Sequence, residues 1–167
     1  MLKPMTHHLR EKIKMHIKNG LDISELIKDV SIKGEDFSYS KIKYFHRVGE
    51  DFSNTNFYNA SIGSEDKISM ILNCNIQHCN FQKTKFIGKF FLRHTDARWA
   101  IFREASGPEV EYQFTDFRGC SFCHAVMKIG TEEGIGCKFD LEFFKDLTKG
   151  WGIDIEVKDK QNGASNV

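Results

Sequence analysis

A five-residue period runs through the middle of this chain and constrains its fold more than any other feature. From Val30 the sequence divides into VSIKG EDFSY SKIKY FHRVG EDFSN TNFYN ASIGS EDKIS, and from Ser69 into SMILN CNIQH CNFQK TKFIG KFFLR. After one extra residue, His94, the frame resumes at Thr95 and continues to Ile129. With only two one-residue slips, the period covers about twenty blocks.

The five positions of a block differ in character. The third is usually large and apolar, the first is often small, the second is often Asp or Asn, and the last two are mostly polar. This period fits neither an α-helix nor a β-strand. It predicts stacked turns of chain that bury the third positions in a continuous column. The core residues expected on this basis are Phe37, Phe52, Phe57, Ile76, Phe81, Phe86, Phe91, Phe102, Phe117 and Phe122.

The blocks TDFRG, CNFQK, TNFYN and EDFSN resemble the consensus of the pentapeptide-repeat family, and the resemblance covers about three-fifths of the chain. It implies an all-β solenoid, a right-handed quadrilateral β-helix in which four blocks make one coil. The first and third positions would then point inward. The repeat region would form about five coils, in a rod roughly 25 Å long.

The ends of an open solenoid need caps, because they expose apolar core and unpaired backbone. Residues 1–29 predict an N-terminal helical cap, with one helix between Thr6 and Gly20 and a second over 22–30. The β-helix itself is expected over 30–129. Residues 130–157 predict a C-terminal cap with a short helix and a strand, and 158–167 a disordered tail.

Four third positions depart from the apolar pattern. Arg47 and Lys67 are charged, and Ala97 and Gly107 are small. Counting blocks in fours places all of these except Ala97 on one side of the rod. We therefore expect that side to be irregular, with a bulge near 45–49 and a loop at 105–109.

The stretch Cys120-x-x-Cys123-His124 has the spacing by which c-type haem is attached. The frame instead places Cys120 inward and Cys123 and His124 outward, so the two thiols would point to opposite sides of the wall. Cys79 would lie on the same side as Cys120 but two coils away, too far for a disulfide. His78 and His124 would lie on different sides, so we expect neither haem nor zinc, and no other cofactor.

Composition narrows the functional classes. The net charge is +1, and no basic stripe indicates direct nucleic-acid binding. No apolar run is long enough to span a membrane, and the N-terminus lacks the pattern of a signal peptide, so we expect a cytoplasmic protein. Phosphate-binding loops and the GxSxG and HExxH motifs are absent from the sequence, which favours a non-enzyme.

We therefore expect a non-catalytic scaffold that mediates protein–protein interaction. Exposed aromatic residues and arginines contribute disproportionately to binding. The candidate interaction residues are Tyr39, Tyr44, Tyr58, Trp99 and Arg103. The sequence leaves the partner protein open.

The resemblance implies alternatives to a general scaffold. One is a DNA-mimicking modulator of a type II topoisomerase, and another is a bacterial effector or host-interaction protein. A DNA mimic needs an acidic strip, and here the candidate acids are interrupted by basic residues: Asp36, Asp51, Asp96 and Asp116 by Lys41, Lys85, Arg98 and Arg118. The resemblance also implies a homodimer through the C-terminal cap, as an alternative to a plugged monomer.

Overall fold

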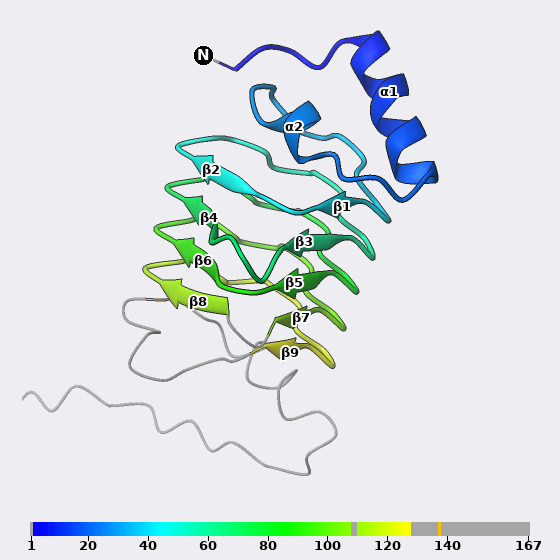
Figure 1. The fold of residues 1–167 in the computed structure, drawn as a ribbon. Helices are drawn as coiled ribbons and strands as arrows, with labels where there is room; N and C mark the ends of the chain where they lie inside the picture. Colours follow the sequence, from blue (N-terminus) through cyan, green and yellow to red (C-terminus); the bar gives the residue numbers. More distant parts are fainter. Residues whose placement is uncertain (1, 108–109, 128–136, 138–167) are drawn as a thin grey trace, which may run out of the picture.

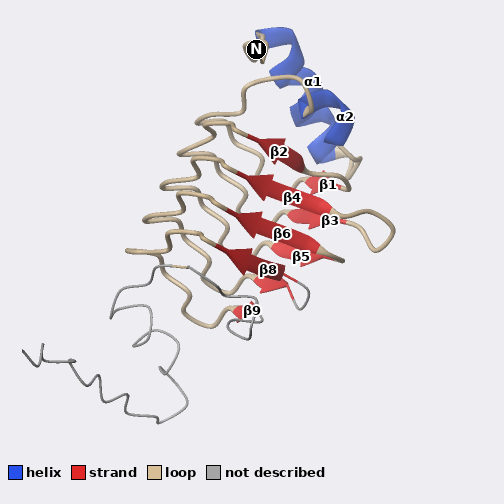
Figure 2. Cartoon of the chain, turned by 90° about the vertical axis from the view of Figure 1, so that its left-hand side faces the viewer, coloured by secondary structure: helices blue, strands red, loops and turns tan. Residues whose placement is uncertain are grey.

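The computed structural model describes residues 2–107, 110–127 and 137, which form a β-solenoid with a helix at its N-terminal end (Figure 1). Successive turns of chain stack below the helices, and strands of neighbouring turns lie side by side (Figure 2). The described strands pair in parallel throughout. The stacked turns predicted from the period, and the β-solenoid that the family resemblance implies, are therefore confirmed. Apart from Cys137, the predicted C-terminal cap (130–157) and tail (158–167) lie outside the described residues.

The N-terminal helix forms where the sequence predicted it. α1 covers His7–Lys18, and its N-cap is Thr6, whose Oγ1 accepts a hydrogen bond from the Leu9 N–H at 3.2 Å. Ile13 is buried, and the helix packs that side of its surface against the core.

The second helix is shorter than predicted. α2 covers only Ser24–Ile27, whereas the sequence indicated a helix over 22–30. Asp22 explains the late start, because its carboxylate accepts hydrogen bonds from the Ser24 N–H and from the Lys43 N–H of the next turn. Asp22 also forms a parallel bridge with Lys41, so this segment already belongs to the solenoid pairing.

The strands form two sheets, and each sheet runs along the length of the solenoid. The five-stranded sheet has the order β1-β3-β5-β7-β9, and the four-stranded sheet has the order β2-β4-β6-β8. In chain order the strands are β1 (Lys41–Ile42), β2 (His46–Val48), β3 (Ser61–Gly63), β4 (Ser69–Leu72), β5 (Lys85–Ile87), β6 (Phe90–Arg93), β7 (Ser106–Gly107), β8 (Val110–Gln113) and β9 (Val126–Met127).

Two further lines of pairing complete each turn. Isolated parallel bridges link equivalent residues of successive turns along a third face and a fourth face. The third face runs through Asp51, Asn75, Asp96 and Asp116, and the fourth through Asp36, Asn56, Asn80, Ile101 and Ser121. Each turn therefore has four sides, and one block of the sequence period supplies each side.

The core is a column of stacked phenylalanines inside the fourth face. Adjacent ring centroids lie between 4.9 and 5.7 Å apart from turn to turn, and the ring planes are within 24° of parallel. Such offset stacking stabilises the pairs beyond simple burial. The members of this column are Phe37, Phe57, Phe81, Phe102 and Phe122. Nine of the ten core residues predicted from the sequence are buried.

Phe91 is the exception, and its prediction as a core residue is wrong. In β6 the buried residues are Phe90 and Leu92, while Phe91 is half-buried on the outer side of the sheet. The register explains this, because Leu92 pairs with the buried Ile71 of β4. The extra residue is therefore Lys89, before the strand, and not His94 after it.

The block EDKIS is not a side of the solenoid. His46 of β2 pairs with Met70 of β4, 24 residues later, whereas Lys41 of β1 pairs with Ser61 after 20. The four additional residues, 65–68, form an exposed excursion at the corner between β3 and β4. Lys67 lies in this excursion and is exposed, so its predicted inward position is wrong.

Glycine allows the excursion to pack against the next turn. Gly88 has φ +66°, and a Cβ atom at this position would lie 2.3 Å from the Ser64 carbonyl oxygen. No other residue type fits there without moving the backbone.

The irregular side expected from Arg47 and Gly107 does not exist. Arg47 lies in β2 and Gly107 in β7, which belong to different sheets. The bulge expected at 45–49 is also wrong, because β2 pairs with β4 residue by residue. The predicted loop at 105–109 includes 108–109, outside the described residues, and Ser106 of this segment is in β7.

Arg47 nevertheless points inward and is buried, and acceptor oxygens around it take hydrogen bonds from its guanidinium. Its guanidinium donates to the Ile27 carbonyl at 2.6 Å, the Val30 carbonyl at 3.3 Å and the Glu50 carboxylate at 2.9 Å. It thereby links the end of α2 to the first strand of the four-stranded sheet. Burial raises the pKa of Glu50, although Arg47 opposes the shift.

The second position of a block forms its turn. Where it is Asp or Asn, the side-chain oxygen accepts a hydrogen bond from the N–H two residues later, as in an Asx turn. The acceptors are Asp36, Asp51, Asn56, Asn75, Asn80, Asp96 and Asp116. The chain then turns the corner with the fifth residue at positive φ, as at Asn54, His78 and Trp99.

Candidate protein-interaction face

The outer side of the four-stranded sheet presents its second and fourth block positions in two columns. Pairing places His46, Met70, Phe91 and Glu111 in the first column, and Val48, Leu72, Arg93 and Gln113 in the second. The strand alternation directs these side chains outward, because the residues between them are buried. Equivalent positions on the third face are mostly Asp, Asn, Gln and Arg.

The centre of this outer side is apolar. Val48 is 48% exposed, and Met70, Leu72 and Phe91 are half-buried. Other exposed apolar side chains adjoin the ends of these strands: Tyr44 (42% exposed) precedes β2, Ile68 (49%) precedes β4, and Phe114 (50%) follows β8, where it stacks on His94. We call the seven residues Tyr44, Val48, Ile68, Met70, Leu72, Phe91 and Phe114 the apolar face.

Contacts hold the polar rim of the apolar face in place. The Arg93 guanidinium lies 4.1 Å from the centroid of the Phe91 ring and 3.3 Å from the Glu111 carboxylate. At the other end, the Tyr44 ring stacks on His46 with 5.9 Å between centroids, and Lys67 Nζ lies 5.7 Å above Tyr44. The aromatic side chains are therefore held in defined positions.

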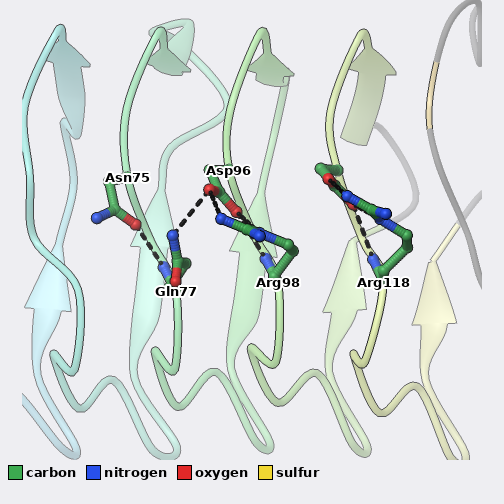
Figure 3. Close-up of polar contacts among 6 residues, drawn as sticks. Asn75, Gln77, Asp96, Arg98 and Arg118 are labelled. Atoms are coloured by element: carbon green, nitrogen blue, oxygen red, sulfur yellow. Dashed lines mark hydrogen bonds and ion pairs between the residues drawn. The ribbon is translucent and has the colours of Figure 1, made fainter.

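The third face is a ladder of paired charges. Arg98 forms a two-bonded ion pair with Asp96, with contacts of 2.9 and 2.7 Å, and Arg118 repeats the geometry on Asp116 one turn later. Gln77 donates from the preceding turn to Asp96 at 2.8 Å, which joins the turns (Figure 3). The Arg98 hydrogen bond lowers the pKa of Asp96 below its ordinary value.

The acidic strip considered from the sequence is divided between faces. Asp51, Asp96 and Asp116 line the third face, whereas Asp36 lies on the fourth. The three carboxylates on the third face pair with Lys33, Arg98 and Arg118. Of the predicted interrupting residues, Lys41 and Lys85 lie on the five-stranded sheet instead.

The five interaction residues predicted from the sequence do not form one site. Only Tyr44 belongs to the apolar face. Tyr39, Tyr58 and the exposed Arg103 extend from blocks of the fourth face, where Tyr39 and Tyr58 make an edge contact at 5.5 Å. Trp99 lies at a corner after the third face and stacks on His78 at 5.2 Å.

The sequence prediction missed Val48, Met70 and Leu72, and it assigned Phe91 to the core. A signal for them was present. The blocks FHRVG and SMILN, and the correctly framed FFLRH, place apolar residues at second or fourth positions, where most of the other blocks are polar.

The cysteines lie as the frame predicted. Cys79 and Cys120 are buried on the fourth-face line, two turns apart, and their thiols donate to the Phe52 and Ala97 carbonyls at 3.1 and 2.8 Å. Burial raises the pKa of Cys79 to about 12, so this thiol is not a reactive thiolate. Cys123 is half-buried and its neighbour His124 is exposed.

Among the described residues, no group of three or more His, Cys, Asp and Glu side chains could hold a metal ion. Nor does this part of the chain contain a helix long and apolar enough to cross a membrane.

Comparison with known proteins gives structural similarity only. No protein-family model matches the sequence, and no curated protein matches it. A pentapeptide repeat protein from the thylakoid lumen of Arabidopsis thaliana is 17% identical with a TM-score of 0.28; the match covers 64% of this chain and 59% of that one. Rfr23 from the cyanobacterium Cyanothece 51142 is 16% identical with a TM-score of 0.26, and the match covers 63% and 67% of the two chains.

These structural neighbours are pentapeptide repeat proteins. They therefore belong to the family that the sequence resembles. QnrB1, a plasmid-mediated fluoroquinolone resistance protein, is also similar, at 14% identity and a TM-score of 0.24, with 77% of this chain and 86% of that chain covered. At such identities and scores the likeness adds no detail to the fold, which rests on the strand pairing itself.

Proposed function

We propose that this chain is a non-catalytic scaffold of the cytoplasm that binds a partner protein through the apolar face. One observation carries the proposal: apolar residues occupy outward positions on three successive strands, β2, β4 and β6, of the four-stranded sheet. Outward positions of a solenoid contribute nothing to its core. Contiguous exposed apolar surface with a polar rim is typical of protein-binding sites.

In this proposal the rod provides rigidity. Each outward side chain is fixed by the inward residues on either side of it, as Met70 is by the buried Ser69 and Ile71. A pre-ordered surface loses little conformational entropy on binding. The right-handed, roughly five-coil geometry implied by the family resemblance would make this surface a flat panel along the rod.

The DNA-mimic alternative has less support. Mimicry of phosphate charge requires carboxylates without cationic partners, whereas Asp96 and Asp116 are neutralised by Arg98 and Arg118 on the same face. The similarity to QnrB1 concerns the fold alone. A role as an effector or host-interaction protein would use the same apolar face, and it differs from the proposal only in the origin of the partner.

An affinity capture with matched variants tests the proposal. Leu72→Arg places a charge at the centre of the apolar face, beside the guanidinium of Arg93, and Ile101→Arg places the same charge on an outward apolar position of the fourth face. We expect wild type and Ile101→Arg to capture the same proteins from an extract of the native host. Leu72→Arg should lose them while its circular dichroism remains unchanged. Equal capture by both folded variants would contradict the proposal.

A further inference from the structure

The apolar face has a symmetry that suggests its partner. β4 and β6 lie at the centre of the four-stranded sheet, with β2 on one side and β8 on the other. Each strand contributes one outward residue to each of the two columns. A two-fold axis parallel to the strands, between β4 and β6, would place β2 of one molecule against β8 of another. Isologous contacts of this kind are the commonest in oligomers.

We propose that the occupant of the apolar face is a second copy of this chain, packed with its rod antiparallel to the first. The inference rests on the proposed function, since it names the partner of the same surface. In this arrangement Met70 of each copy faces Phe91 of the other. The thioether and the aromatic ring are a favourable pair, and two such contacts form at the centre.

The polar residues at the ends of the columns are complementary under the same symmetry. His46 begins the first column and Glu111 ends it, so each imidazole N–H meets a carboxylate of the other copy. In the second column, Leu72 faces Arg93, whose guanidinium lies against its own Phe91 ring and Glu111 carboxylate, and Val48 faces Gln113. No like charges oppose each other in these four pairings.

The size of the face sets the expected affinity. Four strands about 4.8 Å apart, with about four residues each at about 3.3 Å per residue, give a panel of roughly 19 by 13 Å, or about 250 Å² per copy. Even with its flanking aromatic residues, this panel is smaller than the roughly 800 Å² per partner of a standard specific interface. We therefore expect a weak, reversible dimer with a Kd of about 100 µM, and not an obligate one.

A charge swap tests the pairing directly. Sedimentation velocity would be measured from about 5 to 500 µM on wild type, His46→Glu, Glu111→Lys and the double swap. Both residues lie on the outer side, so the variants should fold as wild type does by circular dichroism. We expect each single variant to weaken dimerisation about tenfold, because like or unmatched groups then face each other twice. The double swap should restore it, and Ile101→Arg should leave it unchanged.

The outcomes separate this inference from the proposed function. A wild type that is monomeric at every concentration, or a double swap that fails to restore the dimer, overturns the inference. If Leu72→Arg still loses the captured host proteins in that case, the proposed function stands with a different partner. A dimer restored by the swap, with capture of other host proteins unaffected by Leu72→Arg, supports the second copy and refutes the binding of a different host protein at this face.

Discussion

Phe81 and Gln82 are neighbours in the chain but face opposite sides of one wall. The Phe81 ring stacks between those of Phe57 and Phe102, each 5.1 Å away, and only 1% of it is exposed. Gln82 points outward and is half-buried. At the scale of single residues, the position within a block therefore decides whether a side chain contributes to folding or to the surface.

This contrast gives a paired prediction. Phe81→Asp buries a charge without a partner inside the aromatic column, so we expect it to abolish the cooperative unfolding transition or lower the free energy of unfolding by more than about 4 kcal/mol. Gln82→Asp should change it by less than about 0.5 kcal/mol. Urea denaturation followed by circular dichroism measures both, and similar losses for the two variants would refute the assigned register.

The charge ladder predicts a pH-dependent stability. Because Arg98 lowers the pKa of Asp96 below its ordinary value of 3.8, the folded state binds this proton less readily than the unfolded state. The stabilisation is fully present above about pH 4 and is lost as the pH falls through the lower, folded-state pKa.

Asp96→Asn isolates this effect, because Asn75, the equivalent residue in the preceding turn of the solenoid, forms the same Asx turn with an amide side chain. We expect the variant to be about 0.2–1 kcal/mol less stable than wild type at pH 7, a small value because the pair is partly exposed. The difference should vanish near pH 2. A deficit that persists unchanged at acid pH would show that the charge is not its cause.

At the scale of the elements, the excursion at 65–68 is the segment that the strand pairing of the solenoid needs least. β3 and β4 belong to different sheets, and the four residues between their blocks take part in neither. They account for the 24-residue step between His46 and Met70.

Deleting residues 65–68 should therefore shorten this turn to the 20-residue step seen elsewhere and leave the fold intact. We expect the midpoint of thermal unfolding to change by only a few degrees. Deleting the block 55–59, which forms one side of a turn, should unfold the protein, because every later block would move to the wrong side. Comparable thermal midpoints for the two deletions would contradict the four-sided turn.

The period alone was sufficient to predict the solenoid and most of its core, because each inward position repeats with the same chemistry. It could not place the slips. EDKIS has two acids and an apolar residue, so it looks like a block although it lies outside the walls. In KFFLRH either Phe91 or Leu92 fits the apolar third position, and only pairing with Met70 and Ile71 of β4 decides between them.

The interaction face was harder to predict for a related reason. A single-residue error in the frame moves a side chain from one side of the wall to the other. With Phe91 placed in the core, the outward apolar column had no centre, and the exposed aromatics Tyr39, Tyr58 and Trp99 appeared to be the better candidates. The structure distributes those three away from the apolar face.

At the scale of the whole molecule, one set of turns supplies two different surfaces. The phenylalanine column inside the fourth face and the threonine and cysteine donors beside it hold successive turns together. On the outside, the third face is polar and internally paired, while the centre of the outer side of the four-stranded sheet is apolar. Burying the outer side of the four-stranded sheet would remove more apolar area from water than burying the third face.

Hydroxyl-radical footprinting read by mass spectrometry tests this account most directly. In dilute protein, Met70 and Phe91 should be oxidised readily, whereas Phe81 and Phe90 should resist. At concentrations where the chain self-associates, Met70 and Phe91 should become protected while the exposed Met15 and Trp99 stay reactive. The account would be contradicted if Phe91 resisted oxidation in dilute protein as strongly as Phe90, or if Met70 and Phe91 stayed fully reactive in the dimer.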